Sequence, residues 1–410
     1  MPVGLSAPES LTPIDGVRVG TAAAGSRKGP GDDLTLFSFS SETEVAATFT
    51  DNAFCAAPVI VAREHLGRAR PRCLLVNVGS ANAGTGEPGI ADARRCCALV
   101  AKALSARDDQ VGVDSILPFS TGVIGEPLAM DRIAGAIPEA VESLKAEGWL
   151  EAAQAILTTD ILPKGISLSK RIGGRQVRLT GIAKGSGMIH PSMATMLAFI
   201  ATDAKVEAKA LESVLQRAVQ RSFNRISVDG DTSTNDACVL AATGAAGNEP
   251  ITLDSPEYAA FADLVDEATA FLAQAIVRDG EGATKFVEIE VIEGKDEKEC
   301  LQVARTVAHS PLVKTALYAG DANWGRILAA VGRAGLPELD IARIRIWLGK
   351  TCIVSLGARD PEYREEAGAA ALAGQEIRIR IALGRGQAAD RMWTCDFSHE
   401  YVSINADYRS

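Results

Sequence analysis

The segment Thr180–Ala204 carries the residue pattern with the clearest chemical meaning in this chain. Glycines and a proline precede a small-residue step, Ala194-Thr195, and an apolar run follows it. A threonine hydroxyl in such a place can attack the carbonyl before it, and hydrolysis of the resulting ester frees a new N-terminus. The freed α-amine has a reference pKa near neutrality, so it suits the role of general base for that hydroxyl. Thr195 is therefore a candidate nucleophile, although the commoner role of such a threonine is a buried residue at a strand start.

A second segment has the groups that could support such a nucleophile. In residues 118–125, PFSTGVIG, a polar and glycine-containing step interrupts an apolar strand. The hydroxyl of Thr121 and the unobstructed backbone N–H of Gly122 would offer two hydrogen bonds to a developing oxyanion. The alternative is an ordinary turn, which is the usual meaning of a Ser-Thr-Gly sequence.

Periodicity in the first 280 residues indicates the elements that must position these segments. Alternation at residues 34–39 and 45–49, around a polar stretch, predicts a hairpin, and residues 73–78 form a buried strand candidate. A helix is expected from Asp92, as its cap, to about Ser105, and another around Leu211–Val219. Ser255-Pro256 is expected to cap and begin a third helix.

The last third of the chain alternates more sharply. Residues 286–292, 341–348 and 376–383 read as strands with one solvated face, with a helix around Ile327–Val331 between the first two. Strands and helices mix without a regular βαβ rhythm, which indicates the α+β class. The glycine-rich stretch at 280–284 is the expected boundary between a larger domain, residues 1–280, and a smaller one, residues 281–410.

Composition narrows the classes of function. The 410 residues include 42 Lys and Arg against 52 Asp and Glu, a net charge of −10, and 47% are hydrophobic. This acidic balance is unfavourable for binding nucleic acid or an anionic membrane. The N-terminal residues lack a basic segment followed by an apolar one, and no apolar run is long enough to span a bilayer, so a cytoplasmic protein is expected.

Metal and nucleotide motifs are not indicated. The eight cysteines form no CxxC pair and read as small buried residues, and the four histidines have no ligand-like spacing. Residues 229–236, DGDTSTND, lack the glutamate that closes a calcium-binding EF-hand loop. A polar loop bordering the active site is the preferred interpretation, in which Asn235 and Asp236 orient neighbouring groups.

An ordered series of motifs resembles the ornithine acetyltransferase (glutamate N-acetyltransferase) family of arginine biosynthesis. The series extends over nearly the whole chain and comprises TDNAFCAAPV at 50–59, NVGSANAGTG at 77–86, STGVIG at 120–125, TTD at 158–160, KGSGMIHPSMATML at 184–197, DGDTSTND at 229–236, GEGATK at 280–285, GDANWGRI at 320–327 and the terminal YVSINADYRS.

The resemblance implies roles for individual residues. Thr195 would be both the nucleophile of autoproteolysis, which cuts between Ala194 and Thr195, and the acyl acceptor. Thr121 and Gly122 would form the oxyanion hole. The substrate-contacting positions would be Thr158, Lys184, Thr195, Glu281, Asn405 and Ser410, the last standing where the family usually has threonine. Lys184 can pair with a substrate carboxylate, and Glu281 with an ammonium group or with the Thr195 amine.

The resemblance also implies the reaction and the assembly. Acetyl would pass from N-acetylornithine to Thr195, releasing ornithine, and then to glutamate in a ping-pong sequence. The expected fold is a four-layer α-β-β-α catalytic domain with a smaller C-terminal α/β domain whose tail returns to the active site. The cleaved chains would assemble as an α2β2 heterotetramer. No metal or organic cofactor is implied. Some family members accept acetyl-CoA as a second donor, and no residue decides that question here.

Two other interpretations stay open at this point. A self-processing aminopeptidase or amidase would share the autoproteolysis but give the acyl group to water. A binding or scaffold protein without catalysis is the third reading, which intact Thr195, Thr121 and Gly122 disfavour.

Self-cleavage can be tested by mass measurement under denaturing conditions. The wild-type chain is expected to give two fragments, residues 1–194 and 195–410, because the Thr195 hydroxyl attacks the Ala194 carbonyl. The Thr195→Ala variant should give a single uncut species. A wild-type chain that stays whole after prolonged incubation would contradict the mechanism.

Overall fold

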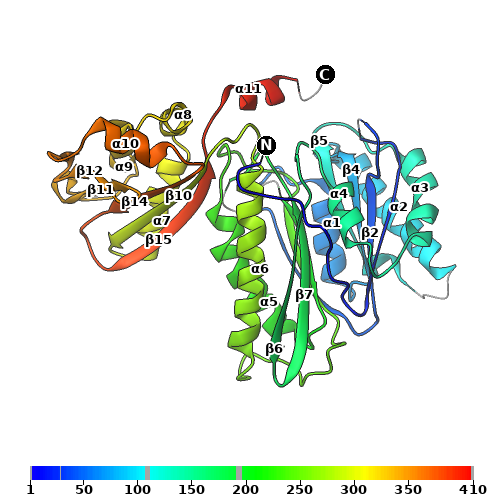
Figure 1. Ribbon diagram of the computed structural model, residues 1–410. Coiled ribbons are helices and arrows are strands. Elements are labelled where there is room, and N and C mark those ends of the chain that lie inside the picture. Colours follow the sequence, from blue (N-terminus) through cyan, green and yellow to red (C-terminus); the bar gives the residue numbers. More distant parts are fainter. Residues whose placement is uncertain (1, 28, 107–110, 191–195, 408–410) are drawn as a thin grey trace. The chain divides into compact units, whose positions relative to one another are not determined.

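The computed structural model describes residues 2–27, 29–106, 111–190 and 196–407. The chain divides into two compact units (Figure 1). The larger unit comprises Ala7–Asn224 and Asp231–Ala273, and the C-terminal unit comprises Met1–Ser6, Arg225–Gly230 and Gln274–Ser410. The sequence-based division at residue 280 stays a prediction about independently folding domains.

Two β-sheets form the centre of the larger unit. The four-stranded sheet has the order β1-β2-β4-β5, with β1 at Val17–Ala22, β2 at Leu34–Phe39, β4 at Cys73–Ser80 and β5 at Ile116–Val123. The five-stranded sheet has the order β3-β9-β8-β7-β6, with β3 at Glu44–Phe49, β9 at Ala237–Ala242, β8 at Leu197–Thr202, β7 at Arg175–Lys184 and β6 at Lys164–Ile172.

Apolar side chains from both sheets pack between them. Phe37 of β2 and Phe119 of β5 contact Phe199 of β8, with ring centroids 5.0 and 5.2 Å away. All three rings are buried, and they belong to one cluster with residues of β1, β4, β7 and β9. The short helix α4 (Trp149–Ala155) adds Trp149 to this cluster. Alternation along each strand therefore directs one face of each sheet into a shared core.

Helices cover the two outer faces, which completes four layers. Cys97, Val100 and other buried residues of α2 (Gly86–Ser105) pack with α3 (Met130–Glu142) against the outer face of the four-stranded sheet, beside α1 (Ala57–Leu66). On the five-stranded sheet, α5 (Ala208–Arg221) contacts β3 and β9. In α6 (Tyr258–Arg278), Leu272 packs against Gly181 of β7. Figure 1 shows these layers, and the expected α-β-β-α architecture of an α+β protein is confirmed.

Strand direction gathers several chain ends at one end of this sandwich. β7 and β8 are antiparallel, so Lys184 at the end of β7 lies opposite Leu197 at the start of β8. β8 and β9 are parallel, so Ala237 begins beside Leu197. β6 and β7 form a hairpin in which Lys164 pairs with Ala183. The segments around Lys164, Lys184, Leu197 and Asp236 therefore meet where the strands of the five-stranded sheet begin or end, on one side of that sheet.

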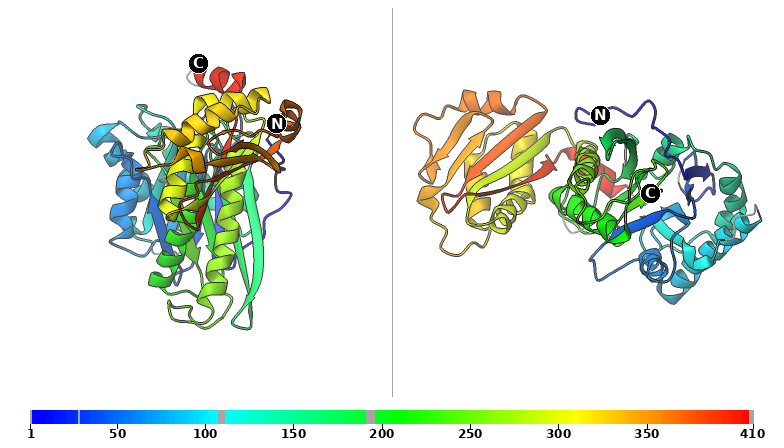
Figure 2. Two further views of the ribbon diagram at one scale, coloured as in Figure 1. Left: turned by 90° about the vertical axis from the view of Figure 1, so that its left-hand side faces the viewer. Right: turned by 90° about the horizontal axis from the view of Figure 1, so that it is seen from below.

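The C-terminal unit contains a six-stranded sheet of order β13-β12-β11-β14-β10-β15. Its strands are β10 (Phe286–Gly294), β11 (Arg345–Leu348), β12 (Thr351–Ser355), β13 (Ala358–Arg359), β14 (Glu376–Ala382) and β15 (Ala388–Cys395). Its helices are α7 (Glu297–Ala308), α8 (Pro311–Ala319), α9 (Trp324–Gly332), α10 (Glu365–Leu372) and α11 (His399–Ala406). Figure 2 shows this unit in yellow to red.

One face of the six-stranded sheet is apolar and the other is charged. Val287, Ile289 and Val291 of β10 share a buried cluster with residues of α7 and α9. The intervening Glu288 and Glu290 form ion pairs with Arg378 and Arg380 of β14. The expected solvated face of these strands is therefore confirmed, as is a smaller C-terminal α/β part.

Three local predictions were wrong. The strands at 34–39 and 45–49 exist but form no hairpin, because β2 pairs with β1 and β4, whereas β3 pairs with β9 in the other sheet. Asp92 does not cap a helix, since α2 begins at Gly86. Ser255 does not cap α6, which begins at Tyr258; its hydroxyl instead closes a turn by donating to the Thr252 carbonyl.

Within the described residues, no helix combines the length and apolar character needed to cross a membrane.

The aromatic contact between the sheets gives a prediction for stability. Phe199→Ala removes the ring that joins Phe37 and Phe119, and it should lower the free energy of unfolding of the larger unit by about 3–5 kcal/mol. Phe271→Ala is a suitable control, because that side chain on α6 is 41% exposed. Urea unfolding of both variants would measure the difference, and equal midpoints would contradict a shared core between the sheets.

Candidate active site

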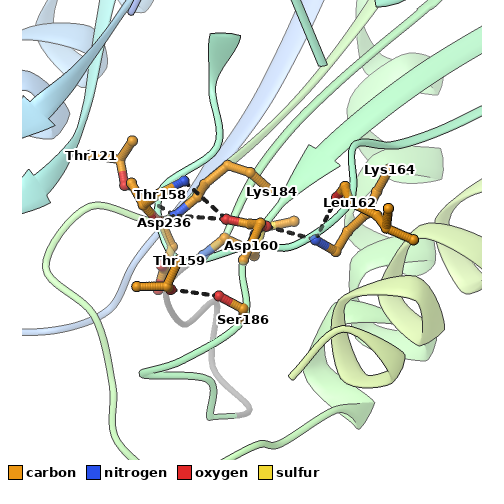
Figure 3. Close-up of polar contacts among 11 residues, drawn as sticks. Thr121, Thr158, Thr159, Asp160, Leu162, Lys164, Lys184, Ser186 and Asp236 are labelled. Carbon is orange, nitrogen blue, oxygen red and sulfur yellow. Dashed lines mark hydrogen bonds and ion pairs between the residues drawn. The ribbon is translucent and has the colours of Figure 1, made fainter. Parts of the chain in front are cut away.

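Lys184 is the central cation of the candidate site. It ends β7, is only 2% exposed, and points into a group of threonine hydroxyls (Figure 3). Its Nζ donates to Thr158 Oγ1 at 2.8 Å and to Thr121 Oγ1 at 3.2 Å. Thr121 lies on β5 of the opposite sheet, so this lysine connects the two sheets at the end of the sandwich where these strand ends meet. A buried ammonium next to two hydroxyls is a suitable binding place for an anionic group.

Asp160 neutralises part of the charge at this site. Its carboxylate accepts from Lys164 Nζ at 2.7 Å and lies 4.0 Å from Lys184 Nζ, and the side chains of Lys164 and Asp160 are fully buried (0% exposed). The backbone N–H groups of Gly185 and Thr158 also donate to it, at 2.7 and 3.1 Å. Burial alone would raise the pKa of Asp160, but the ammonium groups of Lys164 and Lys184 hold that pKa far below its ordinary value.

The arrangement of Thr121 and Gly122 differs from the turn considered above. β5 continues through Val123, so both residues belong to the end of a strand. Gly122 has φ +134° and lies opposite Gly79 of β4, and a Cβ on Gly122 would come within 2.3 Å of the Gly79 carbonyl carbon. Only glycine fits this close approach of two parallel strands. The glycine therefore lets the strand carry the buried Thr121 hydroxyl to Lys184.

Residues 231–236 form a tightly held loop ahead of β9. The Asn235 side-chain amide donates to the carbonyls of Ala81 and Ser120, at 2.6 and 2.9 Å. Asp236 Oδ1 accepts from the backbone N–H of Met196 at 2.9 Å. Burial raises the pKa of Asp236 well above its ordinary value, and the Met196 N–H only partly offsets this effect. The loop therefore holds Asp236 beside the start of β8, and its role as a border of the active site stays a prediction.

The other predicted residues fall in two places. Ala194, Thr195 and Ser410 lie outside the described residues. Glu281 and Asn405 belong to the C-terminal unit, where Asn405 of α11 donates to Glu281 Oε2 at 2.7 Å. The structure thus brings together Thr121, Gly122, Thr158 and Lys184 in one unit, and Glu281 with Asn405 in the other.

Sequence reasoning missed Asp160 and Lys164. Asp160 belongs to the TTD motif but has no predicted role there, and Lys164 belongs to none of the motifs. A signal was present, because a carboxylate and a lysine four residues apart flank the start of an alternating strand. Without knowledge that β6 pairs with β7, however, neither residue could be placed beside Lys184. Among the described residues, no group of three or more His, Cys, Asp or Glu side chains could hold a metal ion.

The chain is similar to known proteins over nearly its whole length. Residues 18–410 match the ArgJ family. The chain is 56% identical over 400 residues to the arginine biosynthesis bifunctional protein ArgJ of Methylococcus capsulatus, covering 98% of this chain and 97% of that protein. Together these matches show that the chain belongs to the ArgJ family, which confirms the resemblance found from its motifs.

Two solved structures are also similar to parts of the chain. A crystal structure of the arginine biosynthesis bifunctional protein ArgJ from Bacillus halodurans has 40% identity and a TM-score of 0.48, covering 50% of this chain and 96% of that one. A structure of ornithine acetyltransferase complexed with ornithine, from Mycobacterium tuberculosis, has 33% identity and a TM-score of 0.39, covering 45% of this chain and 95% of that one.

The buried charges make a prediction for Asp160. Asp160→Asn leaves Lys164 and Lys184 buried without their shared anion, and it should lower the free energy of unfolding by about 3–5 kcal/mol at neutral pH. Glu151→Gln, which breaks the exposed pair with Lys145, should cost under about 1 kcal/mol. Urea unfolding of both variants provides the comparison.

The pH dependence of that difference follows from the sign of the shift. The pKa of Asp160 is lower in the folded state, so its stabilising effect is complete above the ordinary value of 3.8 and is lost as pH falls toward the folded-state value. The gap between wild type and Asp160→Asn should be the same at about pH 5 and about pH 7. A gap that shrinks between those two values would show that the carboxylate is not held ionised.

Proposed function

We propose that this chain is a glutamate N-acetyltransferase of arginine biosynthesis, which transfers acetyl from N2-acetyl-L-ornithine to L-glutamate. Membership of the ArgJ family supports the reaction. The observation that carries the proposal is the buried Lys184 ammonium, which donates to both Thr121 and Thr158. Both amino-acid substrates carry a carboxylate, and a buried, already oriented ammonium can bind it at low reorganisation cost.

The proposed transfer has two half-reactions. The α-amine of Thr195 takes the proton of its own hydroxyl while Oγ attacks the acetyl carbonyl of acetylornithine. The Thr121 hydroxyl and the Gly122 N–H stabilise the tetrahedral oxyanion. Its collapse breaks the C–N bond, the amine proton passes to the leaving nitrogen, and ornithine departs. Glutamate then attacks the Thr195 ester through its α-amino group, which gives N-acetylglutamate and restores the hydroxyl.

Self-cleavage is proposed to prepare this nucleophile. The Thr195 hydroxyl adds to the Ala194 carbonyl, the C–N bond breaks with protonation of the nitrogen, and water hydrolyses the resulting ester. The products are a carboxylate on Ala194 and a free amine on Thr195, which is the base that the transfer needs. The two chains are then proposed to stay together and to assemble as an α2β2 heterotetramer in the cytoplasm.

The remaining contacts and the second donor rest on family membership. Glu281, Asn405 and Ser410 are proposed substrate contacts, and the Glu281–Asn405 hydrogen bond would orient the carboxylate. Because the chain supplies its own nucleophile and base, the proposed chemistry needs no cofactor. Acetyl-CoA fits the first half-reaction as an alternative donor, since its thioester is open to the same attack. The relative from Methylococcus capsulatus is named a bifunctional protein.

Product analysis with purified protein tests the proposal. Acetylornithine plus glutamate should give ornithine and N-acetylglutamate in equal amounts, and the Thr195→Ala variant should give neither. Replacing acetylornithine by acetyl-CoA in the same assay measures use of the second donor. Release of ornithine at an undiminished rate without glutamate would show that water is the acceptor, which would refute acetyl transfer in favour of an amidase.

A further inference from the structure

Asp236 is a buried carboxyl group that the transfer mechanism does not use, and it contacts Met196, the residue after the proposed nucleophile in the sequence. Its side chain is enclosed at the start of β9, and the residue is 1% exposed. Its Oδ1 accepts from Met196 N–H at 2.9 Å, and the carboxyl group also has a hydrogen bond with the Ser233 side chain. The other oxygen, Oδ2, is buried without a hydrogen-bond partner among the described residues. An unpartnered buried polar atom is costly, and its retention calls for an explanation.

Met196 is held at both ends of its backbone. Its N–H donates to Asp236 Oδ1, and its carbonyl accepts from Ala237 N–H at 3.1 Å. Asp236, just before β9, and Ala237, its first residue, therefore fix Met196, just before β8. Met196 directly follows Thr195 in the sequence, so this two-point attachment fixes the neighbour of the proposed nucleophile.

Hydrogen bonds fix the backbone of the segment that carries Asp236. Its carbonyl accepts from Thr50 N–H at 3.0 Å, and the Thr50 hydroxyl donates to the Ser233 carbonyl at 2.8 Å. The Ala56 N–H donates to the Thr234 carbonyl at 2.9 Å. Residues 233–236 are thus tied to the segment between β3 and α1. Because this backbone is fixed, the Asp236 carboxyl group has little freedom to move and can hold a neighbouring residue in place.

The buried surroundings of Asp236 favour its uncharged form. Among the described residues, the charged or titratable side chains that interact with it electrostatically are Lys184 of β7 and Cys55, which precedes α1. Lys184 donates hydrogen bonds to Thr121 and Thr158, and it lies near Asp160, which already supplies a buried negative charge. An ionised carboxylate whose hydrogen-bond partners are two neutral groups, the Met196 N–H and the Ser233 side chain, would be disfavoured in this interior. A protonated carboxyl group still has an oxygen that accepts from the Met196 N–H, and it also has one O–H donor. An asparagine side chain is similar, because it has an acceptor oxygen and N–H donors.

We propose that Asp236 is a positioning residue that acts in its uncharged form: it fixes the Met196 amide, and through it Thr195, both for self-cleavage and for acyl transfer. This inference rests on the proposed function for its second half only, because self-cleavage can be measured without any substrate. A general-base role for Asp236 is excluded by the proposal, and the two roles predict opposite behaviour for an asparagine at this position.

The test compares Asp236→Asn with Asp236→Ala in the full-length chain. Asparagine offers the same acceptor and a donor, so cleavage and acetyl transfer should stay within about threefold of wild type. Alanine removes the attachment of Met196, and both rates should fall about a hundredfold, as expected when a reacting group is misplaced by about 1 Å. The rates are read by denaturing mass measurement and by ornithine release, with thermal unfolding to confirm that each variant is folded.

Asp203 provides a matched control. It is 3% exposed, follows β8 at the end opposite to Met196, and accepts from the Arg178 N–H at 2.7 Å. Asp203→Ala should lower the melting temperature without slowing cleavage. The same loss of cleavage in folded Asp203→Ala and Asp236→Ala would show a general effect of disrupting the sheet and would overturn the proposal.

The remaining outcomes separate this proposal from the proposed function. A folded Asp236→Asn variant as inactive as Asp236→Ala would overturn the uncharged role, and a fully active Asp236→Ala variant would overturn positioning. If wild type cleaves but transfers no acetyl group, the acetyltransferase proposal fails, while the cleavage rates still decide the role of Asp236. A wild-type chain that does not cleave would overturn both.

Discussion

The buried carboxylate of Asp160 is the interaction on which the candidate site depends. It joins the loop before β6 to the ends of β6 and β7 through Lys164, Gly185 and Lys184. Two ammonium groups could not share this interior without an anion between them, because the desolvation of each charge is costly. Asp160 therefore allows Lys184 to reach Thr121 and Thr158 as a positioned donor, and the site has one excess positive charge available for an anionic substrate group.

The two sheets supply what that charge cluster needs. Their shared core brings β5 against β7, so that a threonine from one sheet meets a lysine from the other. Paired glycines, Gly79 and Gly122, permit the close strand contact at the end of β5. At the neighbouring ends of β8 and β9, Asp236 and Ala237 hold Met196 by its backbone N–H and carbonyl. The region around Met196 and Lys184 is thus built from several strand ends.

Local pattern predicted much of the fold, and tertiary pairing explains why the expected hairpin does not form. The strands at 34–39, 45–49 and 73–78 follow from alternation, which depends on neighbours in sequence. Whether β2 pairs with β3 is decided instead by which apolar faces meet across the molecule, and β3 joins β9. Motifs identified Thr121, Gly122 and Lys184. Asp160 and Lys164 escaped because their importance comes from burial and mutual contact, which no local spacing displays.

Thr195 is expected to carry the acetyl group between the two substrates. The most direct measurement is the intact mass of the C-terminal fragment, residues 195–410, after brief mixing with acetylornithine. The fragment should gain the mass of one acetyl group, and added glutamate should remove that mass while N-acetylglutamate forms. Formation of N-acetylglutamate in rapid single-turnover mixing, with the fragment at its unmodified mass throughout, would contradict the acetyl-threonine intermediate.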